Sequence, residues 1–208
     1  MAKRMILKEG DPALNRKSRP VTRFDARLKT LVEDMLETMY DGEGVGLAAP
    51  QVGVLRRLFV LDVGDENGAM VFINPDIKDV KGEQEGMEGC LSIPDLYGVV
   101  KRPMEVLVSA QDKDGRSFEI RLTGLGARCV CHECDHLDGI LFRRRSETPL
   151  ITLDELKKLL DEEKNEVSPE DRVDAEDKER QENASESIGE ALTDYGAGTP
   201  DEEYAQEL

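Results

Sequence analysis

Both histidines of the 208-residue chain lie in one stretch, Cys129-Val130-Cys131-His132-Glu133-Cys134-Asp135-His136. On an α-helix, residues four apart lie one above the other, about 6 Å apart along the axis, so His132 and His136 would present two imidazoles to one point. Glu133 lies about 100° further round the helix, close enough to reach a water molecule at that point. The spacing therefore predicts a metal-binding helix with a general base beside the metal, in preference to a surface helix with two incidental histidines.

A catalytic metal site of this kind needs a third protein ligand, and no further histidine is present. Cys129 would lie between the two histidines on the helix but one turn lower, at the floor of the site, and Cys131 and Cys134 would project to the other side. The remaining thiol is that of Cys90, in Glu88-Gly89-Cys90-Leu91-Ser92, where a glycine allows a close approach of the backbone. We therefore predict a metal site with three ligands and a base: Cys90, His132, His136 and Glu133.

Three motifs follow one another along roughly the first 165 residues: Gly44-Val45-Gly46-Leu47-Ala48-Ala49-Pro50-Gln51, Glu88-Gly89-Cys90-Leu91-Ser92 and His132-Glu133-Cys134-Asp135-His136. Together they resemble the ordered motifs of the peptide deformylases, which is a far more specific match than any one motif alone. The resemblance implies that the substrate is the N-formyl group of formyl-methionine on nascent peptides. The products would be formate and a free amino terminus.

The ligand set and the base suit the hydrolysis of an amide. Glu133 would accept a proton from the attacking water and deliver it to the leaving nitrogen. The developing oxyanion needs hydrogen-bond donors, and the candidates are the Gln51 side-chain amide, the backbone N–H of Leu91 and the metal ion. The glycine-rich loop before Gln51 is not a phosphate-binding loop, because no Lys-Ser/Thr pair follows it.

The resemblance also implies a cofactor and a substrate pocket. The cofactor is one divalent metal ion per chain, Fe²⁺ in the cell, with Zn²⁺, Ni²⁺ or Co²⁺ able to replace it. An apolar pocket beside the metal would accommodate the methionine thioether. The positions that match those lining or bordering this pocket and the substrate strand in the family are Val45, Gly46, Glu88, Leu125 and Cys129.

Two cysteines depart from the family pattern. Cys131 stands where many members have Gln, and Cys134 where many have an aliphatic residue. Neither is an expected ligand or base, so the departures do not argue against activity. Thiols three residues apart on a helix could nevertheless be oxidisable. Our hypothesis is that peroxide inactivates the protein through Cys90 and not through this pair.

The secondary structure that the sequence predicts is not in βαβ alternation, so the fold class is α+β. With the family resemblance, we expect a peptide-deformylase-like fold with antiparallel sheets around a central metal-binding helix. Apolar residues recur at three and four from Leu28 to Met39, which predicts an amphipathic helix closing near Gly42. The metal helix should begin after Thr123 and run to about Leu137, and a last helix should open at Thr152 with a capping box to Glu155.

Five strands are expected from runs of β-branched and aromatic residues. Asn74-Pro75 should end the second of them, and Asp114-Gly115 is a hairpin signal between the third and the fourth. The expected strands are residues 58–63, 70–73, 106–110, 118–122 and 140–142.

Charge divides the chain into two parts. Residues 161–208 hold 18 acidic and 4 basic residues, a net charge of −14 out of −17 for the whole chain. We expect a catalytic domain at residues 1–164 and an acidic, disordered tail that aids solubility at residues 165–208. The chain shows no apolar run suited to a signal peptide or a membrane span, and its cysteines do not form a disulfide framework. A cytoplasmic, bacterial-type monomer is the expectation.

Three other classes of protein compete with this interpretation. A metal-dependent endopeptidase shares the helix motif, and would cleave unformylated peptides and survive Cys90→Ser. A structural zinc module of Cys129, Cys131, Cys134 and His132 would unfold with chelator, but these cysteines point to different sides of one helix. A nucleic-acid- or ribosome-binding protein could use Arg143-Arg144-Arg145, although the acidic tail would repel RNA. We expect no specific DNA binding, and only a weak, transient ribosome contact.

Overall fold

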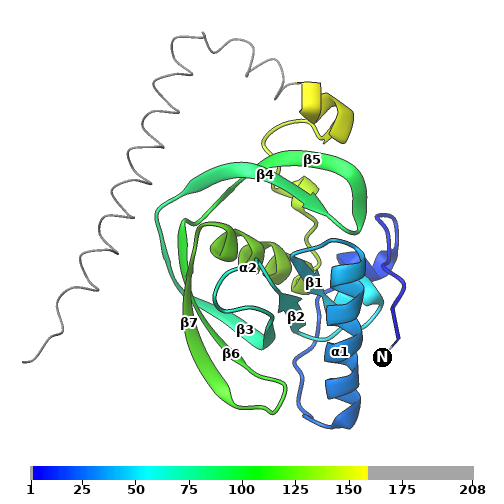
Figure 1. The fold of residues 1–208 in the computed structure, drawn as a ribbon, viewed down its shortest axis with the longest axis vertical. Coiled ribbons are helices and arrows are strands. Elements are labelled where there is room, and N and C mark those ends of the chain that lie inside the picture. The colour runs from blue at the N-terminus through cyan, green and yellow to red at the C-terminus, as the bar shows by residue number, and fades with distance from the viewer. Residues whose placement is uncertain (1, 159–208) are drawn as a thin grey trace, which may run out of the picture. The chain divides into compact units, whose positions relative to one another are not determined.

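Two antiparallel sheets with a helix between them form the centre of the fold (Figure 1). The computed structural model describes residues 2–158, and a compact unit ends at Leu156. The strands and helices follow one another without βαβ alternation, so the α+β class is confirmed. The tail expected at residues 165–208 lies outside the described residues, and the boundary at 164 stays a prediction. No helix of the described part has the length and hydropathy to cross a membrane.

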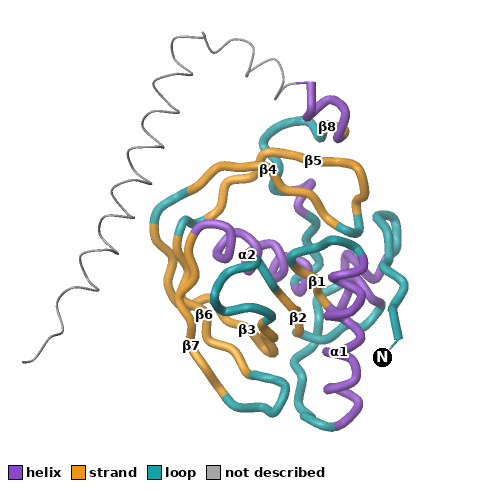
Figure 2. Tube along the Cα trace, in the orientation of Figure 1, coloured by secondary structure: helices purple, strands orange, loops and turns teal. Residues whose placement is uncertain are grey.

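The larger sheet has five strands in the order β1-β2-β3-β6-β7 (Figure 2). Each strand pairs antiparallel with its neighbour. In β6 every second residue is buried, the alternation expected of a sheet with one face on the core. The strands are β1 (Gly46–Ala48), β2 (Leu58–Leu61), β3 (Met70–Lys81), β6 (Glu105–Gln111) and β7 (Ser117–Thr123).

The smaller sheet has three strands in the order β4-β5-β8 and holds one side of the candidate site. Its strands are β4 (Gln84–Cys90), β5 (Ile93–Arg102) and β8 (Ile151–Thr152). β4 and β5 form a long hairpin, in which Cys90 pairs with Ile93 across a two-residue turn. Neither β4 nor β5 was predicted from the sequence.

Two helices cover opposite faces of the larger sheet, and β2 shows why. All four residues of β2 are buried: Leu58 and Val60 belong to the core cluster of α1 (Ala26–Asp41), and Phe59 and Leu61 to the cluster of α2 (Gly124–Leu137). Because side chains alternate along a strand, one continuous apolar run serves both faces. The helix predicted to close near Gly42 is confirmed, with Gly42 as its C-cap.

The ends of α2 are close to those expected. Thr123 occupies the N-cap position, but its side chain makes no capping hydrogen bond. The predicted capping box after α2 is present, since Thr152 Oγ1 accepts from the Glu155 backbone N–H at 3.2 Å and the Glu155 carboxylate accepts from the Thr152 N–H at 2.7 Å. Residues 153–158 are helical. The short 3₁₀ helices are η1 (Pro12–Asn15), η2 (Ala49–Val52) and η3 (Phe142–Arg144).

The strand expected at residues 58–63 ends at Leu61, and two other expectations about strands were wrong. β3 does not end at Asn74-Pro75 but continues to Lys81, because a register shift between Ile73 and Asp76 accommodates the proline, which cannot donate to the ladder. Asn74 adopts φ +52° there, and its side chain hydrogen-bonds the backbone of Val21.

Residues 140–142 do not form a strand, because Leu141 precedes η3 and Phe142 begins it. Leu141 and Phe142 are buried in a third core cluster with Leu14, Ile93 and Val100. The apolar run therefore reflects burial and not extended backbone.

We predict that Gly139→Ala destabilises the fold far more than Gly64→Ala, its matched control. Gly139 (φ +74°) and Gly64 (φ +76°) share a left-handed backbone, so each alanine should lower the free energy of unfolding by about 1–2 kcal/mol. A Cβ at Gly139 would also lie 2.7 Å from the Asn15 carbonyl carbon, whereas one at Gly64 meets nothing within 4 Å. This overlap should add about 1–3 kcal/mol, measured by urea unfolding. Equal losses in the two variants would contradict the packing argument.

Candidate active site

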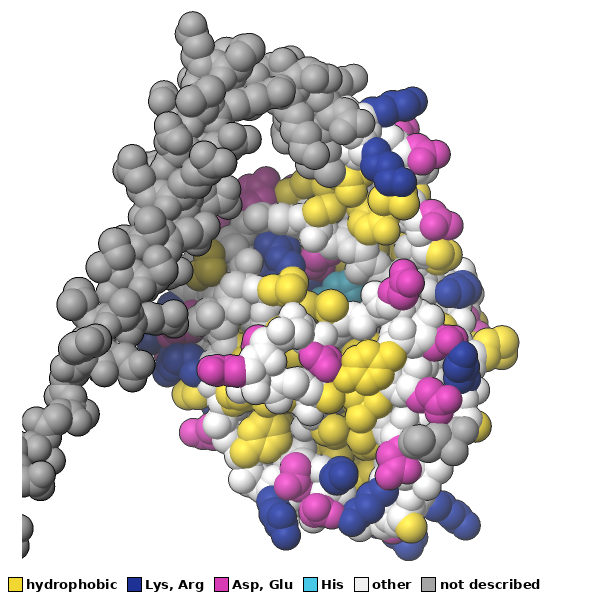
Figure 3. Space-filling model, viewed as in Figure 1, with side chains coloured by type: hydrophobic (Ala, Val, Ile, Leu, Met, Phe, Trp, Pro, Cys, Tyr) yellow, Lys and Arg dark blue, Asp and Glu magenta, His cyan; other side chains and the backbone are white. Residues whose placement is uncertain are grey.

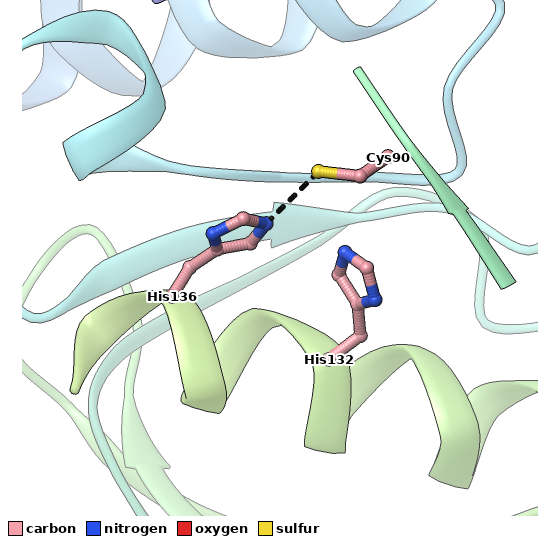
Figure 4. Close-up of side chains that lie close together, drawn as sticks. All are labelled: Cys90, His132 and His136. Carbon is pink, nitrogen blue, oxygen red and sulfur yellow. Dashed lines mark hydrogen bonds between the residues drawn. The ribbon is translucent and has the colours of Figure 1, made fainter. Parts of the chain in front are cut away.

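Cys90, His132 and His136 lie together, with the two imidazoles rising from α2 toward the thiol at the end of β4 (Figure 4). Their candidate ligand atoms all lie within 4.8 Å of one another. The Cys90 Sγ is 3.2 Å from the His136 Nε2, and the two imidazole centroids are 4.9 Å apart. One thiol and two imidazoles at this separation form a donor set that fits Zn²⁺, Fe²⁺ and related divalent ions.

Glu88 orients the ring of His132. Its Oε2 lies 2.9 Å from the His132 Nδ1. Burial alone would raise the pKa of Glu88, but hydrogen bonds from His132 and Arg102 lower it to about 2, so the carboxylate can only accept. The His132 Nδ1 therefore carries the proton, which leaves Nε2 as the nitrogen that faces a metal ion.

The two imidazoles differ in their electrostatic surroundings. Burial would lower the pKa of His132, but the nearby Cys90 and the hydrogen bond with Glu88 raise it to about 10. Burial and the neighbouring His132 hold the pKa of His136 well below its ordinary value. His136 is therefore neutral, as a ligand must be, and the negative groups around His132 favour a cation, either a proton or a metal ion.

Glu133 lies buried beside the ligand cluster, with a side chain suited to accept and return a proton. Burial raises its pKa to about 7, and its Oε2 has no hydrogen-bond partner among the described residues. A Cβ on residue 46 would lie less than 3.0 Å from the Glu133 Oε1, so glycine at Gly46 allows the carboxylate to lie against β1. A carboxyl group with a pKa near neutrality matches the requirement for a general base.

Gln51 and Leu91 lie next to the cluster from two different elements. Gln51 is fully buried in η2, where its Oε1 accepts from the Ala48 N–H at 2.8 Å, so its Nε2 turns toward the Cys90 Sγ, 3.5 Å away, and the Ser92 Oγ, 3.2 Å away. Leu91 lies in the turn between β4 and β5, outside the strand pairs. The Lys8 Nζ donates to the Leu91 carbonyl at 2.7 Å.

A cavity of about 680 Å³ opens beside the cluster. In Figure 3 a histidine side chain is visible within a hollow that hydrophobic side chains border. Val45 and Leu125 are exposed at its edge, whereas Cys129 is buried in its wall. Every residue predicted to bind substrate or stabilise the oxyanion lines this cavity: Val45, Gly46, Gln51, Glu88, Leu91, Leu125 and Cys129.

The sequence did not predict the arginines around Glu88. Arg102 binds both carboxylate oxygens, through Nε at 2.9 Å and Nη2 at 3.0 Å, and Arg128 Nη1 donates to Oε1 at 3.1 Å. Both arginine side chains are under 10 % exposed. The sequence does contain a signal for Arg128. Its neighbours on the metal helix are small or apolar residues, and a charged side chain among them needs a buried partner.

The other three cysteines take no part in the cluster. Burial raises the pKa of Cys129 to about 12 and that of Cys131 to about 11, and it also raises the pKa of Cys134. All four cysteines are free thiols. Among the described residues the one group with metal-ligand spacing is Cys90, His132 and His136, which argues against the structural zinc module. Neutral thiols also oxidise slowly, in keeping with our hypothesis about peroxide.

The three consecutive arginines after α2 each have a separate intramolecular partner. Arg143 Nε lies 2.9 Å from the Glu9 carboxylate, and Arg144 Nη2 donates to the Asn15 Oδ1 at 2.9 Å. Arg145 pairs with Asp135 at 2.9 Å. The cluster is therefore partly neutralised within the protein and is not a free basic patch.

Comparison with known proteins gives a consistent family. The sequence profile described as polypeptide deformylase matches residues 3–149. A peptide deformylase of Caldicellulosiruptor bescii is 52% identical over 142 residues, which are 68% of this chain and 84% of the relative. A peptide deformylase of Thermoanaerobacter pseudethanolicus is 48% identical over 166 residues, which are 80% of this chain and 97% of the relative.

The solved structures give the same result for the fold. The crystal structure of the peptide deformylase from Thermotoga maritima has a TM-score of 0.69 and 42% identity, and the match covers 71% of this chain and all of that one. A peptide deformylase from Legionella pneumophila has a TM-score of 0.66 and 44% identity, with 76% of this chain and 98% of that one covered. The expected deformylase-like fold is thereby confirmed.

Proposed function

Because the chain belongs to the polypeptide deformylase family, it is a hydrolase that removes the N-formyl group from N-terminal formyl-methionine, and we propose which of its residues perform this reaction. The observation that carries the assignment is the position of Cys90, His132 and His136 beside the buried carboxylate of Glu133, next to an open cavity. These three side chains hold the metal ion in our proposal. Newly made polypeptides that begin with formyl-methionine are the substrates.

The metal ion in the cell is Fe²⁺ in this proposal, and Zn²⁺, Ni²⁺ or Co²⁺ can replace it. A thiolate with two imidazoles suits these ions, and three protein ligands leave a coordination position for substrate or water. When bound, the ion supplies a Lewis acid that polarises the formyl carbonyl and lowers the pKa of water toward neutrality. Support for one site per chain comes from the single ligand cluster of the described residues.

Glu133 is the proton carrier of the proposed reaction. Its unpartnered Oε2 accepts a proton from the attacking water, and the same oxygen returns the proton to the leaving nitrogen. Burial raises the pKa of Glu133 to about 7, which suits a group that both accepts and returns a proton. Gly46 keeps the carboxylate in place by leaving room for its Oε1.

Gln51 and Leu91 stabilise the oxyanion in our proposal. The Gln51 Oε1 is held by the Ala48 N–H, so the amide cannot turn over without the loss of that hydrogen bond, and its Nε2 stays on the side of Cys90. The Leu91 N–H lies outside the β4–β5 strand pairs and is available to a ligand. Two donors already fixed in the ground state need no reorganisation when negative charge develops.

The methionine side chain occupies the apolar part of the cavity in this proposal. Val45, Leu125 and Cys129 supply apolar surface, and the flat backbone of Gly46 borders the substrate strand. Glu88 also borders the cavity, but its carboxylate is fully used by Arg102, Arg128 and His132. Its contribution is therefore to position His132 and not to bind substrate directly.

The cytoplasm is the compartment that fits the proposed thiolate ligand, because its reducing conditions keep Cys90 available to the metal. We propose a bacterial-type enzyme that acts as a monomer, makes no specific contact with DNA, and visits the ribosome only transiently. We expect the ribosome contact to be weak because each of the three consecutive arginines already has a partner within the protein. They are Arg143, Arg144 and Arg145.

Glu133→Ala should strongly reduce formate release from formyl-Met-Ala-Ser, because the variant lacks the proposed proton carrier. The protein is purified anaerobically with Fe²⁺, and kcat should fall by about 10²–10⁴ while the metal content stays at one ion per chain. Glu119→Gln, an exposed carboxylate on β7, is the matched control and should keep full activity. Cleavage of unformylated peptides, or activity that survives Cys90→Ser, would favour the endopeptidase.

Gln51→Ala should lower kcat with little change in KM. The loss of one preorganised oxyanion donor costs about 3 kcal/mol, which is a 10²–10³-fold fall in kcat. Gln111→Ala removes an amide from β6 that bonds Asn74 and Gly115 away from the cavity, and serves as the control. A variant at Gln51 that keeps full kcat would remove this residue from the oxyanion site.

Ribosome binding should be weak and should disappear as salt rises, because it depends on exposed charge. The measurement is co-sedimentation with ribosomes at low and at physiological ionic strength. Arg144→Gln should reduce the bound fraction, and Lys78→Gln, an exposed cation on β3, should not. Salt-independent sedimentation, or none at low salt, would count against the contact.

A further inference from the structure

A buried chain of alternating charges leads from the segment after α2 to the metal site. The Asp135 Oδ1 accepts from Arg145 Nη2 at 2.9 Å, and its Oδ2 accepts from Arg145 Nε at 3.2 Å and from Arg102 Nη1 at 2.6 Å. Arg102 then binds both oxygens of Glu88, which holds His132. The side chains in the middle are poorly exposed, 6 % for Arg102, 4 % for Glu88 and 12 % for Asp135.

Four side chains form a closed ring of contacts between α2 and the β4–β5 hairpin: His132, Glu88, Arg102 and Asp135. His132 and Asp135 are three residues apart on one face of α2, while Glu88 and Arg102 lie on β4 and β5. Together with the hydrogen bonds from Arg128, these contacts attach the hairpin to the helix, and β4 ends at Cys90. Because two ligands lie on α2 and one on β4, the contacts of this ring contribute to the separation between the thiol and the imidazoles.

We propose that Asp135 is a positioning residue that acts on the metal ligand His132 through Arg102 and Glu88. The inference rests on the proposed ligand role of His132. Without the negative charge of Asp135, the Arg102 guanidinium keeps a single carboxylate partner in a buried position, and its orientation is no longer fixed from both ends. Glu88 then holds the His132 ring less firmly, and the metal ion should leave more readily.

Asp135→Asn is expected to accelerate metal loss. The Zn²⁺-loaded protein is mixed with excess chromophoric chelator, and the dissociation rate should rise about 10–100-fold, the usual effect of losing a partner that orients a ligand. Asp138→Asn is the matched control, because the Asp138 carboxylate also pairs with two cations, Arg57 at 2.8 Å and Lys17 at 3.5 Å, but is 40 % exposed and bonds neither Arg102 nor Arg145. Its rate should change less than about twofold.

A double variant tests whether the effect passes through Glu88. Glu88→Gln alone should accelerate Zn²⁺ loss, and adding Asp135→Asn should increase the rate no further, because the path is already broken. The visible absorption of the Co²⁺-loaded variants should show the same non-additive pattern, because this absorption depends on the ligands and not on global stability. Additive effects of the two substitutions, or an Asp135→Asn rate equal to that of Asp138→Asn, would overturn the proposal.

A second pair of variants covers the case in which Asp135→Asn does not fold. Arg145→Gln removes a half-exposed partner of Asp135 and should accelerate Zn²⁺ loss by about two- to fivefold. Arg143 lies two residues before Arg145 and pairs with Glu9 at the surface. Arg143→Gln breaks that pair and should not change the rate of Zn²⁺ loss. Equal rates in these two variants would overturn the inference.

The failure of this inference can be told apart from the failure of the proposed function. Wild-type protein should bind one Zn²⁺ tightly, and His132→Ala should lose this binding. If His132→Ala bound Zn²⁺ as tightly as the wild type, the ligand assignment would fail. If His132→Ala lost Zn²⁺ binding but Asp135→Asn released Zn²⁺ at the wild-type rate, the ligand assignment would stand and the role of Asp135 would be wrong.

Discussion

The site depends on holding a helix and a hairpin at a fixed separation. Cys90 ends β4 and the two histidines lie on α2, so the ligand atoms stay within 4.8 Å of one another only if the two elements cannot slide. Glu88 provides much of this restraint, because it accepts from two arginines and from His132. A buried carboxylate is costly in isolation, but saturation by donors keeps it ionised and fixes its geometry.

Features that depend on neighbouring residues could be predicted from the sequence. The four-residue spacing of His132 and His136, the apolar face of α1 and the hairpin at Asp114-Gly115 each reflect one local period or one turn. Cys90 could be chosen by elimination, because the other thiols share the helix with the histidines. Local chemistry and three ordered motifs were enough to predict the fold class and the clustering of Cys90, His132 and His136.

Features that depend on distant partners could not be predicted. β4 contains two glycines and three polar residues, so it lacks the pattern of a strand, and its pairing with β5 gives it its structure. Arg102 and Asp135 are 33 residues apart, and nothing near either one shows that they meet. Asn74-Pro75 resembles a strand end locally, and only the register shift against β6 shows that β3 continues.

The fold also explains why one thiol among four can serve as a metal ligand. Cys129, Cys131 and Cys134 lie on the metal-binding helix itself, but all three belong to or pack against the core cluster between α2 and the larger sheet. Burial raises the pKa of each, which disfavours the thiolate form. Cys90 instead comes from the hairpin, with its Sγ next to His136 and the Gln51 amide. The position of each thiol therefore distinguishes Cys90 from the others. The helix places its three sulfurs in the core or, for Cys129, in the cavity wall, and the hairpin places the Cys90 sulfur next to the histidines.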